Sequence, residues 1–370
     1  MSSVTLIILI SLVLGVAGGV IMHRADFCLA GAIRDIFLFR SSPLLPSLVL
    51  LIALNIVLIE VARLAGWVTY DLPSSLFGLP SLTTFAGGLF FGIGMVLAGG
   101  CVVGVLYKFG AGSFAALIAI AGMLIGSVVY VSVHPYWTVL AQQTRLSEAA
   151  TLAQLLGVNQ TVMMALVVLL LLYLVVRWHR QGLLVRPSFV GGYLQPRTAA
   201  VLLAFITLVS FAIVGMPLGI TTSYSKAGAY FAQLFAPGWI ASQEFLQLRG
   251  FSYYSPVAET VLNAGPGPYF DGLSLVQFPL IGGIVLGAFF SSVLMKKFTI
   301  HWKVPIIQLA AALSGGILMG MASRMSPACN VWHLLGGIPL LSLQSALFFI
   351  GLFPGAWIGT RLLTRYVVRV

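Results

Sequence analysis

The chain has 370 residues, of which 60% are hydrophobic and only 7% are charged, and its formal net charge is +11. Soluble domains carry about 25% charged residues, so a water-soluble fold of this length would have too few charges to cover its surface. The composition excludes a soluble globular protein, and with it a soluble nucleic-acid-binding protein as the explanation of the positive charge. No nucleic-acid partner is expected.

Long apolar runs predict helices that cross a lipid bilayer. Runs close to twenty residues, such as 4–22 and 161–176, match the thickness of the hydrocarbon core, in which the backbone must satisfy its own hydrogen bonds. The runs do not alternate apolar and polar residues, which argues against a β-barrel. The expected fold class is therefore an all-α polytopic membrane protein. Nine crossings are predicted, at about 3–22, 47–66, 83–99, 113–132, 161–178, 198–215, 276–295, 305–323 and 341–361.

Basic residues predict the orientation of these helices. The first run is followed rather than preceded by basic residues, His23 and Arg24, so a cleavable signal peptide is not expected. Because basic residues mark cytoplasmic loops, the N-terminus is expected outside and the C-terminus in the cytoplasm, with external stretches at about 67–82, 133–160 and 236–275. The basic clusters are Arg34 with Arg40; Arg177, Arg180, Arg186 and Arg197; Lys296, Lys297 and Lys303; and Arg361, Arg365 and Arg369.

Four segments, 23–34, 100–110, 217–233 and 324–337, fit poorly as loops or as complete spans. Each is short and is marked by Gly, Pro or a charged residue. Short segments of this kind, at matching positions of two halves, mark the binding site of many transporters. We therefore expect four short re-entrant helices that meet near the membrane midplane.

The two halves of the chain resemble each other. AGGLFFGIGMVLAGGC, which ends at Cys101, aligns without gaps with SGGILMGMASRMSPAC, which ends at Cys329, and GMLIG from Gly122 matches GLFPG from Gly351. More loosely, CLAG at 28–31 matches SKAG at 225–228. One linker helix, at about 161–178, separates repeats at about 1–135 and 198–370, so the second repeat should run through the membrane in the opposite direction. We expect one integral membrane domain, 1–370, in which Cys101 and Cys329 approach each other.

Three cysteines, Cys28, Cys101 and Cys329, lie in three of the four short segments. Their odd number and the lack of a C-x-x-C pattern argue against a disulfide framework or a zinc site. A buried thiol can donate a weak hydrogen bond, act as a nucleophile or soft ligand, or serve as a small apolar residue. Three thiols at repeat-related positions inside a membrane favour a functional role.

Local patterns place each thiol near the start of a short helix. Asp26 is expected to cap the helix that holds the first cysteine, and Ser326 followed by Pro327 to begin the helix that holds the third. Gly99 and Gly100 allow a sharp turn just before the second cysteine. Since N–H groups and the dipole at a helix start attract anions, the pattern favours an anion as substrate.

Other polar residues in these segments are weaker candidates. Arg324 lies toward the expected outer face, where it can draw anions inward or simply extend to the membrane surface. Ser225 and Lys226 occupy the fourth repeat-related position. Cys329 and His333 are four residues apart, but two ligands are too few for a metal site, and no third group orients a Cys–His pair for catalysis. We expect no metal, no cofactor and no catalytic residue, and there is no nucleotide-binding loop.

The segments RADFCLAGAIRD, LAGGCVVGVLYKFGAGS and MSPACNVWHLLGGIP resemble the YeeE/YedE family, whose best-understood members are thiosulfate transporters. The resemblance covers nearly the whole chain. It implies an inverted repeat, a substrate path along the three cysteines, passage by transient S–H···S contacts, and often a small cytoplasmic sulfur carrier of the TusA type as partner. The candidate substrate-binding residues are Cys28, Cys101, Cys329, Ser225, Lys226, Gly100 and Arg324.

The expected function is uptake of thiosulfate, or of a closely related sulfur-containing anion, across the bacterial cytoplasmic (inner) membrane. Two alternatives remain open at this point. One is transport of a selenium compound or another sulfur species, and the other is a membrane sulfurtransferase that forms a cysteine persulfide. Several cysteines acting in series would indicate transport, whereas one indispensable nucleophile would indicate the enzyme.

Overall fold

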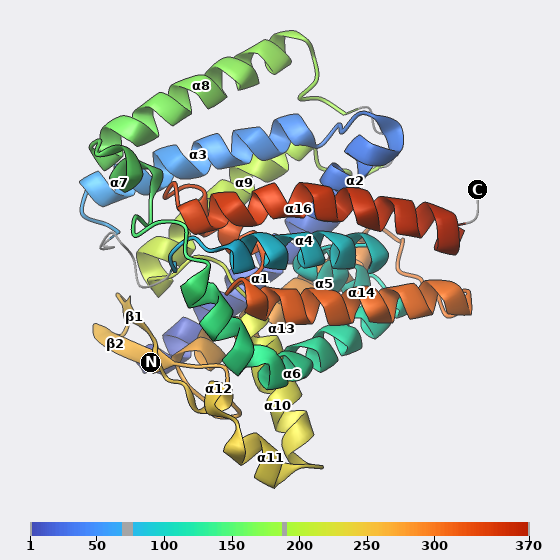
Figure 1. Ribbon diagram of the computed structural model, residues 1–370. Coiled ribbons are helices and arrows are strands. Elements are labelled where there is room, and N and C mark those ends of the chain that lie inside the picture. Colours follow the sequence, from blue (N-terminus) through green and yellow to red (C-terminus); the bar gives the residue numbers. More distant parts are fainter. Residues whose placement is uncertain (1, 69–76, 187–190, 369–370) are drawn as a thin grey trace.

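The computed structural model describes residues 2–68, 77–186 and 191–368, which are mostly helical (Figure 1). Each predicted crossing overlaps one of the long apolar helical segments, so the nine-helix polytopic membrane fold is confirmed for the described part of the chain. Arg369 and part of the predicted external stretch 67–82 lie outside the described residues. The nine segments that could cross a membrane are Ser3–Phe39, Leu45–Leu64, Leu82–Gly110, Phe114–Gln143, Gln160–Arg180, Pro196–Val214, Gly272–Leu294, Ile306–Met325 and Leu343–Val368.

Nine long helices form the bundle. In Figure 1, α8 lies at its edge beside α3, and the marked N- and C-terminal ends lie at opposite ends of the bundle. An odd number of crossings requires this arrangement. The long helices are α1 (Ser3–Ala25), α3 (Leu45–Leu64), α4 (Leu82–Leu97), α6 (Phe114–Gln143), α8 (Gln160–Arg180), α9 (Pro196–Val209), α13 (Gly272–Leu294), α14 (Ile306–Met325) and α16 (Leu343–Leu362).

Shorter elements connect or extend these helices. They are α2 (Leu29–Phe39), α5 (Val102–Gly110), α7 (Leu152–Leu156), α10 (Thr221–Gln233), α11 (Pro237–Ser242), α12 (Glu244–Gln247) and α15 (Asn330–Trp332), with π-helical turns η1 (Ser210–Val214), η2 (His333–Gly337) and η3 (Leu363–Val368). Strands β1 (Phe251–Ser255) and β2 (Thr260–Ala264) form an antiparallel hairpin that pairs Phe251 with Ala264 and Ser255 with Thr260. The hairpin and α12 lie at the end of the bundle that carries the N-terminus (Figure 1).

Glycines let the long helices touch backbone to backbone. A Cβ atom on Gly15 of α1 would collide with the Leu280 carbonyl of α13, and one on Gly88 of α4 would collide with the Phe348 carbonyl of α16. Helix α14 contacts both α4 and α6, and α3 contacts α9. Such close approach is favoured in lipid, where dispersion contacts rather than water exclusion hold helices together. The long helices therefore form a tightly packed bundle.

Each of the four predicted short segments does contain a short helix: α2, α5, α10, and α15 continued by η2. Two predicted helix starts are wrong, however. Asp26 ends α1 with φ 47°, a left-handed conformation that Asp tolerates. Ser326 ends α14 in an extended conformation, because a residue that precedes a proline, here Pro327, avoids the helical region. The predicted sharp turn before Cys101 is present, and Gly99 makes it with φ +71°.

Candidate functional site

The structure places every cysteine directly before a short helix. Cys28 is the N-cap of α2, Cys101 the N-cap of α5 and Cys329 the N-cap of α15, each with extended backbone. All three are free and buried. The unpaired N–H groups of a first helical turn create a positive potential at this position. The thiols thus occupy the places in the fold that are most favourable to an anion.

Two of the thiols form a pair. The sulfur atoms of Cys28 and Cys101 lie 3.9 Å apart, within reach of an S–H···S hydrogen bond, and the Cys101 sulfur also accepts from the Gly104 N–H at 3.3 Å. A Cβ atom on Gly104 would lie 2.7 Å from the Cys28 sulfur, so glycine is needed there to make room for both thiols. Gly100 lies in similarly close contact with the first turn of α5, because its Cβ would be 3.2 Å from Val105 N.

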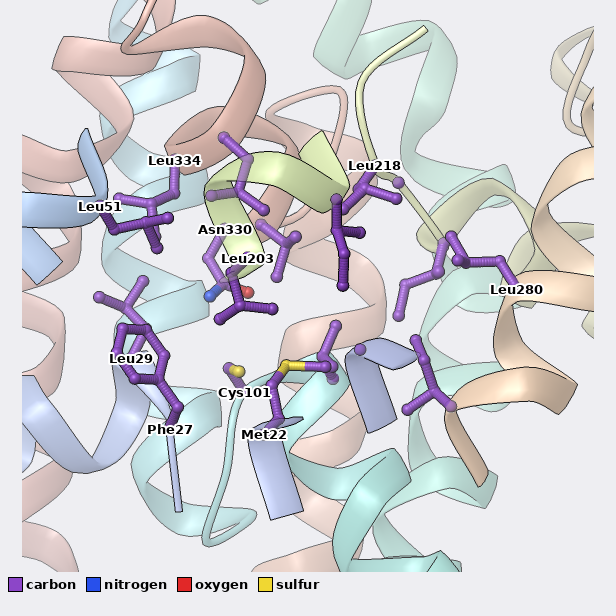
Figure 2. Close-up of a pocket in the computed structure, with 18 of the residues that line it drawn as sticks. Met22, Phe27, Leu29, Leu51, Cys101, Leu203, Leu218, Leu280, Asn330 and Leu334 are labelled. Carbon is purple, nitrogen blue, oxygen red and sulfur yellow. The ribbon is translucent and has the colours of Figure 1, made fainter. Parts of the chain in front are cut away.

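Cys101 also borders a small apolar cavity, which we call the inner cavity (Figure 2). Its volume is about 70 Å³ and its wall consists of leucine and other apolar side chains from α1, α3, α9 and α13. Asn330 is the exception, and Figure 2 shows its amide on the side of the cavity that faces Cys101. The polar side chains among the described residues that line this cavity are therefore the Cys101 thiol and the Asn330 amide.

Cys28 borders a cavity of the opposite character, the polar cavity, whose volume is about 170 Å³. Arg34, Lys108 and Arg186 line it together with Asp26 and Asp35. Some of these charges are engaged: Arg34 pairs with Asp35 at 2.9 Å, and Lys108 Nζ donates to the Gly99 carbonyl at 2.5 Å. The cavity lies beside α2, and its lining carries both cations and carboxylates.

Arg324, on the last turn of α14, borders a third cavity of about 390 Å³, the Arg324 cavity. Its guanidinium donates to the hydroxyl groups of Thr221 at 2.8 Å and Thr222 at 3.3 Å, and its Nε atom is buried without a partner. Among the described residues no carboxylate lies within 4.0 Å of it. A largely buried cation without a counter-ion is a strong attractor for an anionic ligand.

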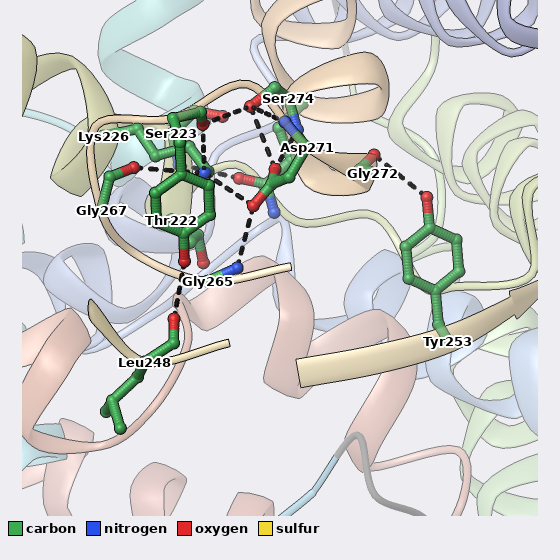
Figure 3. Close-up of polar contacts among 12 residues, drawn as sticks. Thr222, Ser223, Lys226, Leu248, Tyr253, Gly265, Gly267, Asp271, Gly272 and Ser274 are labelled. Atoms are coloured by element: carbon green, nitrogen blue, oxygen red, sulfur yellow. Dashed lines mark hydrogen bonds and ion pairs between the residues drawn. The ribbon is translucent and has the colours of Figure 1, made fainter. Parts of the chain in front are cut away.

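Lys226, by contrast, is fully engaged by protein groups (Figure 3). Its amino group donates to Asp271 at 2.8 Å, to the Tyr269 carbonyl at 2.9 Å and to the Gly267 carbonyl at 3.3 Å. Asp271 is also the N-cap of α13, so the lysine ties α10 to the start of α13. Burial lowers the pKa of Lys226 from its usual 10.5, and the hydrogen bond that Lys226 donates to Asp271 opposes that shift. No hydrogen-bonding capacity of Lys226 is left for a substrate.

A test follows from this arrangement. Replacing Lys226 by Met leaves Asp271 nearly buried without its cation, and breaking a buried pair in this way costs roughly 3–5 kcal/mol. We expect a marked fall in the melting temperature of the detergent-purified protein. Adding Asp271→Asn should recover much of the loss, because Asn caps a helix well without a charge. An unchanged melting temperature with weakened substrate binding would instead make Lys226 a binding residue.

Ser225 does not occupy a position like that of the cysteines. It lies inside α10, which begins at Thr221, and its buried hydroxyl has no hydrogen-bond partner. The N-cap of α10 is Ile220, so the loose sequence match between 28–31 and 225–228 is displaced by about one helical turn from the structural match. Ser225 therefore lies inside α10, after its N-cap Ile220, whereas Cys28 is itself the N-cap of α2.

His333 lies one helical turn after Cys329, and its side chain contacts α16. Its Nδ1 atom is 2.8 Å from the Ser345 hydroxyl of α16, and its ring stacks on Phe348. Within the described ranges, no group of three or more His, Cys, Asp or Glu side chains could hold a metal ion. The Nδ1 atom and ring of His333 thus pack against α16, while its Nε2 atom is buried without a hydrogen-bond partner.

Three residues near the thiols were not predicted. Gly104 makes room for the Cys28–Cys101 pair, while Asn330 and Tyr224 are buried and have side-chain polar atoms without partners. A polar residue directly after a helix-capping cysteine was a usable signal for Asn330. Nothing in the sequence distinguishes Tyr224, because its nearness to the thiols depends on how α10 packs against distant segments.

The chain is similar to known proteins along most of its length. A family model described as sulphur transport matches residues 24–358. A protein of Spirochaeta thermophila named thiosulfate transporter TsuA is 28% identical over 369 residues, which cover 94% of this chain and 97% of that protein. The Escherichia coli protein of the same name is 24% identical over 361 residues, or 95% and 93% of the two chains. A Salmonella typhimurium protein named probable transporter YedE is 25% identical over 175 residues, or 47% of this chain and 39% of that one.

Proposed function

Because the chain belongs to the sulphur transport family, we propose that it carries thiosulfate, or a closely related sulfur-containing anion, across the bacterial cytoplasmic membrane. The anion would enter at Arg324 and pass Cys329, Cys101 and Cys28 in that order. Two relatives that match nearly the whole chain are named thiosulfate transporters. The cysteine-lined path is our inference for this protein.

One observation carries the proposal: the cavities follow one another with a thiol at each junction. Gly219 and Ile220 line both the Arg324 cavity and the inner cavity. Ala328 borders the first of these and Asn330 the second, so Cys329 lies between them. Beyond the inner cavity come the paired thiols of Cys101 and Cys28, 3.9 Å apart, and then the polar cavity. From this order of cavities we infer a narrow route whose constrictions lie at the cysteines.

The chemistry of the route fits a soft sulfur anion. Thiosulfate is a dianion with a terminal sulfur atom that is large, polarizable and weakly hydrated in comparison with its oxygen atoms. Thiols can donate weak hydrogen bonds to that sulfur, and the helix starts at each thiol offset its charge. Sulfate presents only oxygen atoms, so we expect it to lose more hydration in the apolar inner cavity than it regains.

An inverted repeat is supported by the way the glycines pack. Gly88 of α4 meets the Phe348 carbonyl of α16, and the repeat-related Gly316 of α14 meets the Ala119 carbonyl of α6. In the same way, α1 contacts α13 while α9 contacts α3. Contacts therefore recur in pairs when the two halves are exchanged. The approach of Cys101 and Cys329 across such an axis stays a prediction.

The orientation that we propose places the Arg324 cavity outside and the polar cavity in the cytoplasm. The hairpin and the neighbouring stretch, which carry more acidic than basic residues, line the Arg324 cavity. Arg34, Lys108 and Arg186 line the polar cavity, and basic residues gather on the cytoplasmic side of membrane proteins. Substrate would then enter past a single buried cation and leave into a basic vestibule.

The direct test is uptake of radiolabelled thiosulfate into right-side-out vesicles that contain the protein. We expect saturable uptake that unlabelled thiosulfate abolishes and that an equal concentration of sulfate reduces by less than twofold. An introduced cysteine at position 259, labelled from outside by an impermeant reagent, verifies the orientation of the vesicles. Vesicles without the protein are the control. Equal uptake in both preparations would refute the assignment, and stronger competition by selenite or sulfide would redirect it to those species.

A further inference from the structure

Among the described residues that line the inner cavity, Asn330 carries the one polar side chain besides the Cys101 thiol (Figure 2). It is fully buried, with a relative exposure of 0%; neither atom of its amide makes a well-formed hydrogen bond, and the polar group that it interacts with is the Cys101 thiol. Leaving a buried amide unpaired costs free energy, so such groups are rare in folded proteins and call for an explanation.

Packing does not explain the amide. Cys329 and Cys101 correspond in the alignment of the two halves, so the residue that corresponds to Asn330 is Val102. Val102 also follows an N-cap cysteine and is also completely buried. A β-branched apolar side chain therefore fits this place in the fold without an unsatisfied group. The difference between the halves points to a ligand on the Asn330 side.

A second unpaired donor lies nearby. The hydroxyl group of Tyr224, on α10, is buried without a partner and lies within electrostatic reach of both Cys329 and Cys101. Tyr224 is one helical turn after Ile220, which lines both the Arg324 cavity and the inner cavity. Asn330 lines the inner cavity, whereas Tyr224 lines none of the three cavities described above, so the Asn330 amide is the donor that faces the route and the Tyr224 hydroxyl is a second donor near the thiols.

We propose that Asn330 and Tyr224 bind the oxygen atoms of the substrate anion as it passes between Cys329 and Cys101. This inference rests on the proposed function, and it assigns the two ends of the substrate to different groups. The thiols contact the sulfur atom, while the Asn330 amide N–H and the Tyr224 hydroxyl donate to the oxygen atoms. Hydrogen bonds to charged groups are stronger than those between neutral groups, so these two donors offset much of the lost hydration.

The test compares Asn330→Val, the substitution that the other half of the chain already contains, with Asn330→Asp and Tyr224→Phe. We expect Asn330→Val to raise the half-saturation concentration for thiosulfate uptake about tenfold or more. Its melting temperature should equal or exceed that of the unmodified protein, since an unsatisfied group is removed. Asn330→Asp should impair uptake further because its carboxylate repels the dianion, and Tyr224→Phe should raise half-saturation at least twofold.

Asn55 supplies a matched control. It lies on α3, is also fully buried with both amide atoms unpaired, and lines none of the inner, polar and Arg324 cavities. Asn55→Val should leave half-saturation within twofold of the unmodified value. Normal half-saturation in both Asn330→Val and Asn330→Asp would overturn this inference alone. Failure of the unmodified protein to take up thiosulfate would overturn the proposed function instead.

Discussion

Serine in place of Cys101 or Cys329 should reduce thiosulfate uptake at least two- to tenfold, the cost of about 0.5–1.5 kcal/mol for one lost hydrogen bond. The hydroxyl group is similar in size but too hard to match the sulfur atom of the substrate. Cys28→Ser should have a smaller effect, because Cys28 borders the polar cavity, where water can replace the lost contact. Initial uptake rates, normalised to folded protein, measure these differences.

The cysteine series also separates transport from catalysis. If the thiols act in series, the effects of the three replacements should share one direction, and folded protein should remain in the membrane. A sulfurtransferase would fail at one cysteine only, and mass spectrometry would find an added sulfur atom there after exposure to substrate. Uptake at the unmodified rate in a variant with all three cysteines replaced by serine would end the cysteine path, although transport itself would stand.

Loss of the buried cation should have the second large effect. Arg324→Gln keeps a hydrogen-bond donor for Thr221 but removes the only charge that the described side chains contribute to the Arg324 cavity. We expect uptake below half-saturation to fall about tenfold to a hundredfold, the range for losing a charge-assisted hydrogen bond of about 1.5–3 kcal/mol. The remaining uptake should depend less on ionic strength. Arg324→Lys should be intermediate, since lysine keeps the charge but not the planar set of donors.

Arg145 provides the comparison for this variant. It is a second arginine on the proposed outer side, but it pairs with Glu148 at 2.7 Å at the surface. Arg145→Gln should change uptake less than twofold, since exposed ion pairs contribute little. The Arg324→Gln protein should melt no lower than the unmodified protein, because a buried charge without a counter-ion is costly. Equal uptake by the two variants at low ionic strength would show that Arg324 does not attract the substrate.

The membrane fold was predictable because bilayer thickness fixes how long an apolar run must be. The nine crossings, the four short helices and the position of the thiols at helix starts all follow from local signals. The exact caps were missed at Asp26 and Ser326, since each residue instead ends the preceding helix. Ser326 and Pro327 are separated from the next helix by a turn at Ala328, with φ 134°, so that helix begins only at Asn330.

Contacts between distant residues could not be predicted. Lys226 looked like an anion-binding residue because Asp271, 2.8 Å away, is 45 positions later in the chain. The 3.9 Å contact between Cys28 and Cys101 depends in the same way on how the fold brings the starts of α2 and α5 together, with Gly104 making room. Tertiary pairing, rather than local pattern, decides which polar groups remain free for a ligand.

The glycine contacts between the long helices have a consequence for motion. Where Gly15 faces Leu280 and Gly88 faces Phe348, the two backbones touch with no side chain between them. Rocking one half of the bundle against the other would pull these surfaces apart, and lipid tails are too bulky to refill the gap atom for atom. The proposed substrate is about as large as one side chain. We therefore expect its passage to change side-chain rotamers and the turns before α5 and α15, while the long helices keep their positions. Such a protein should conduct its substrate with little change in outer shape.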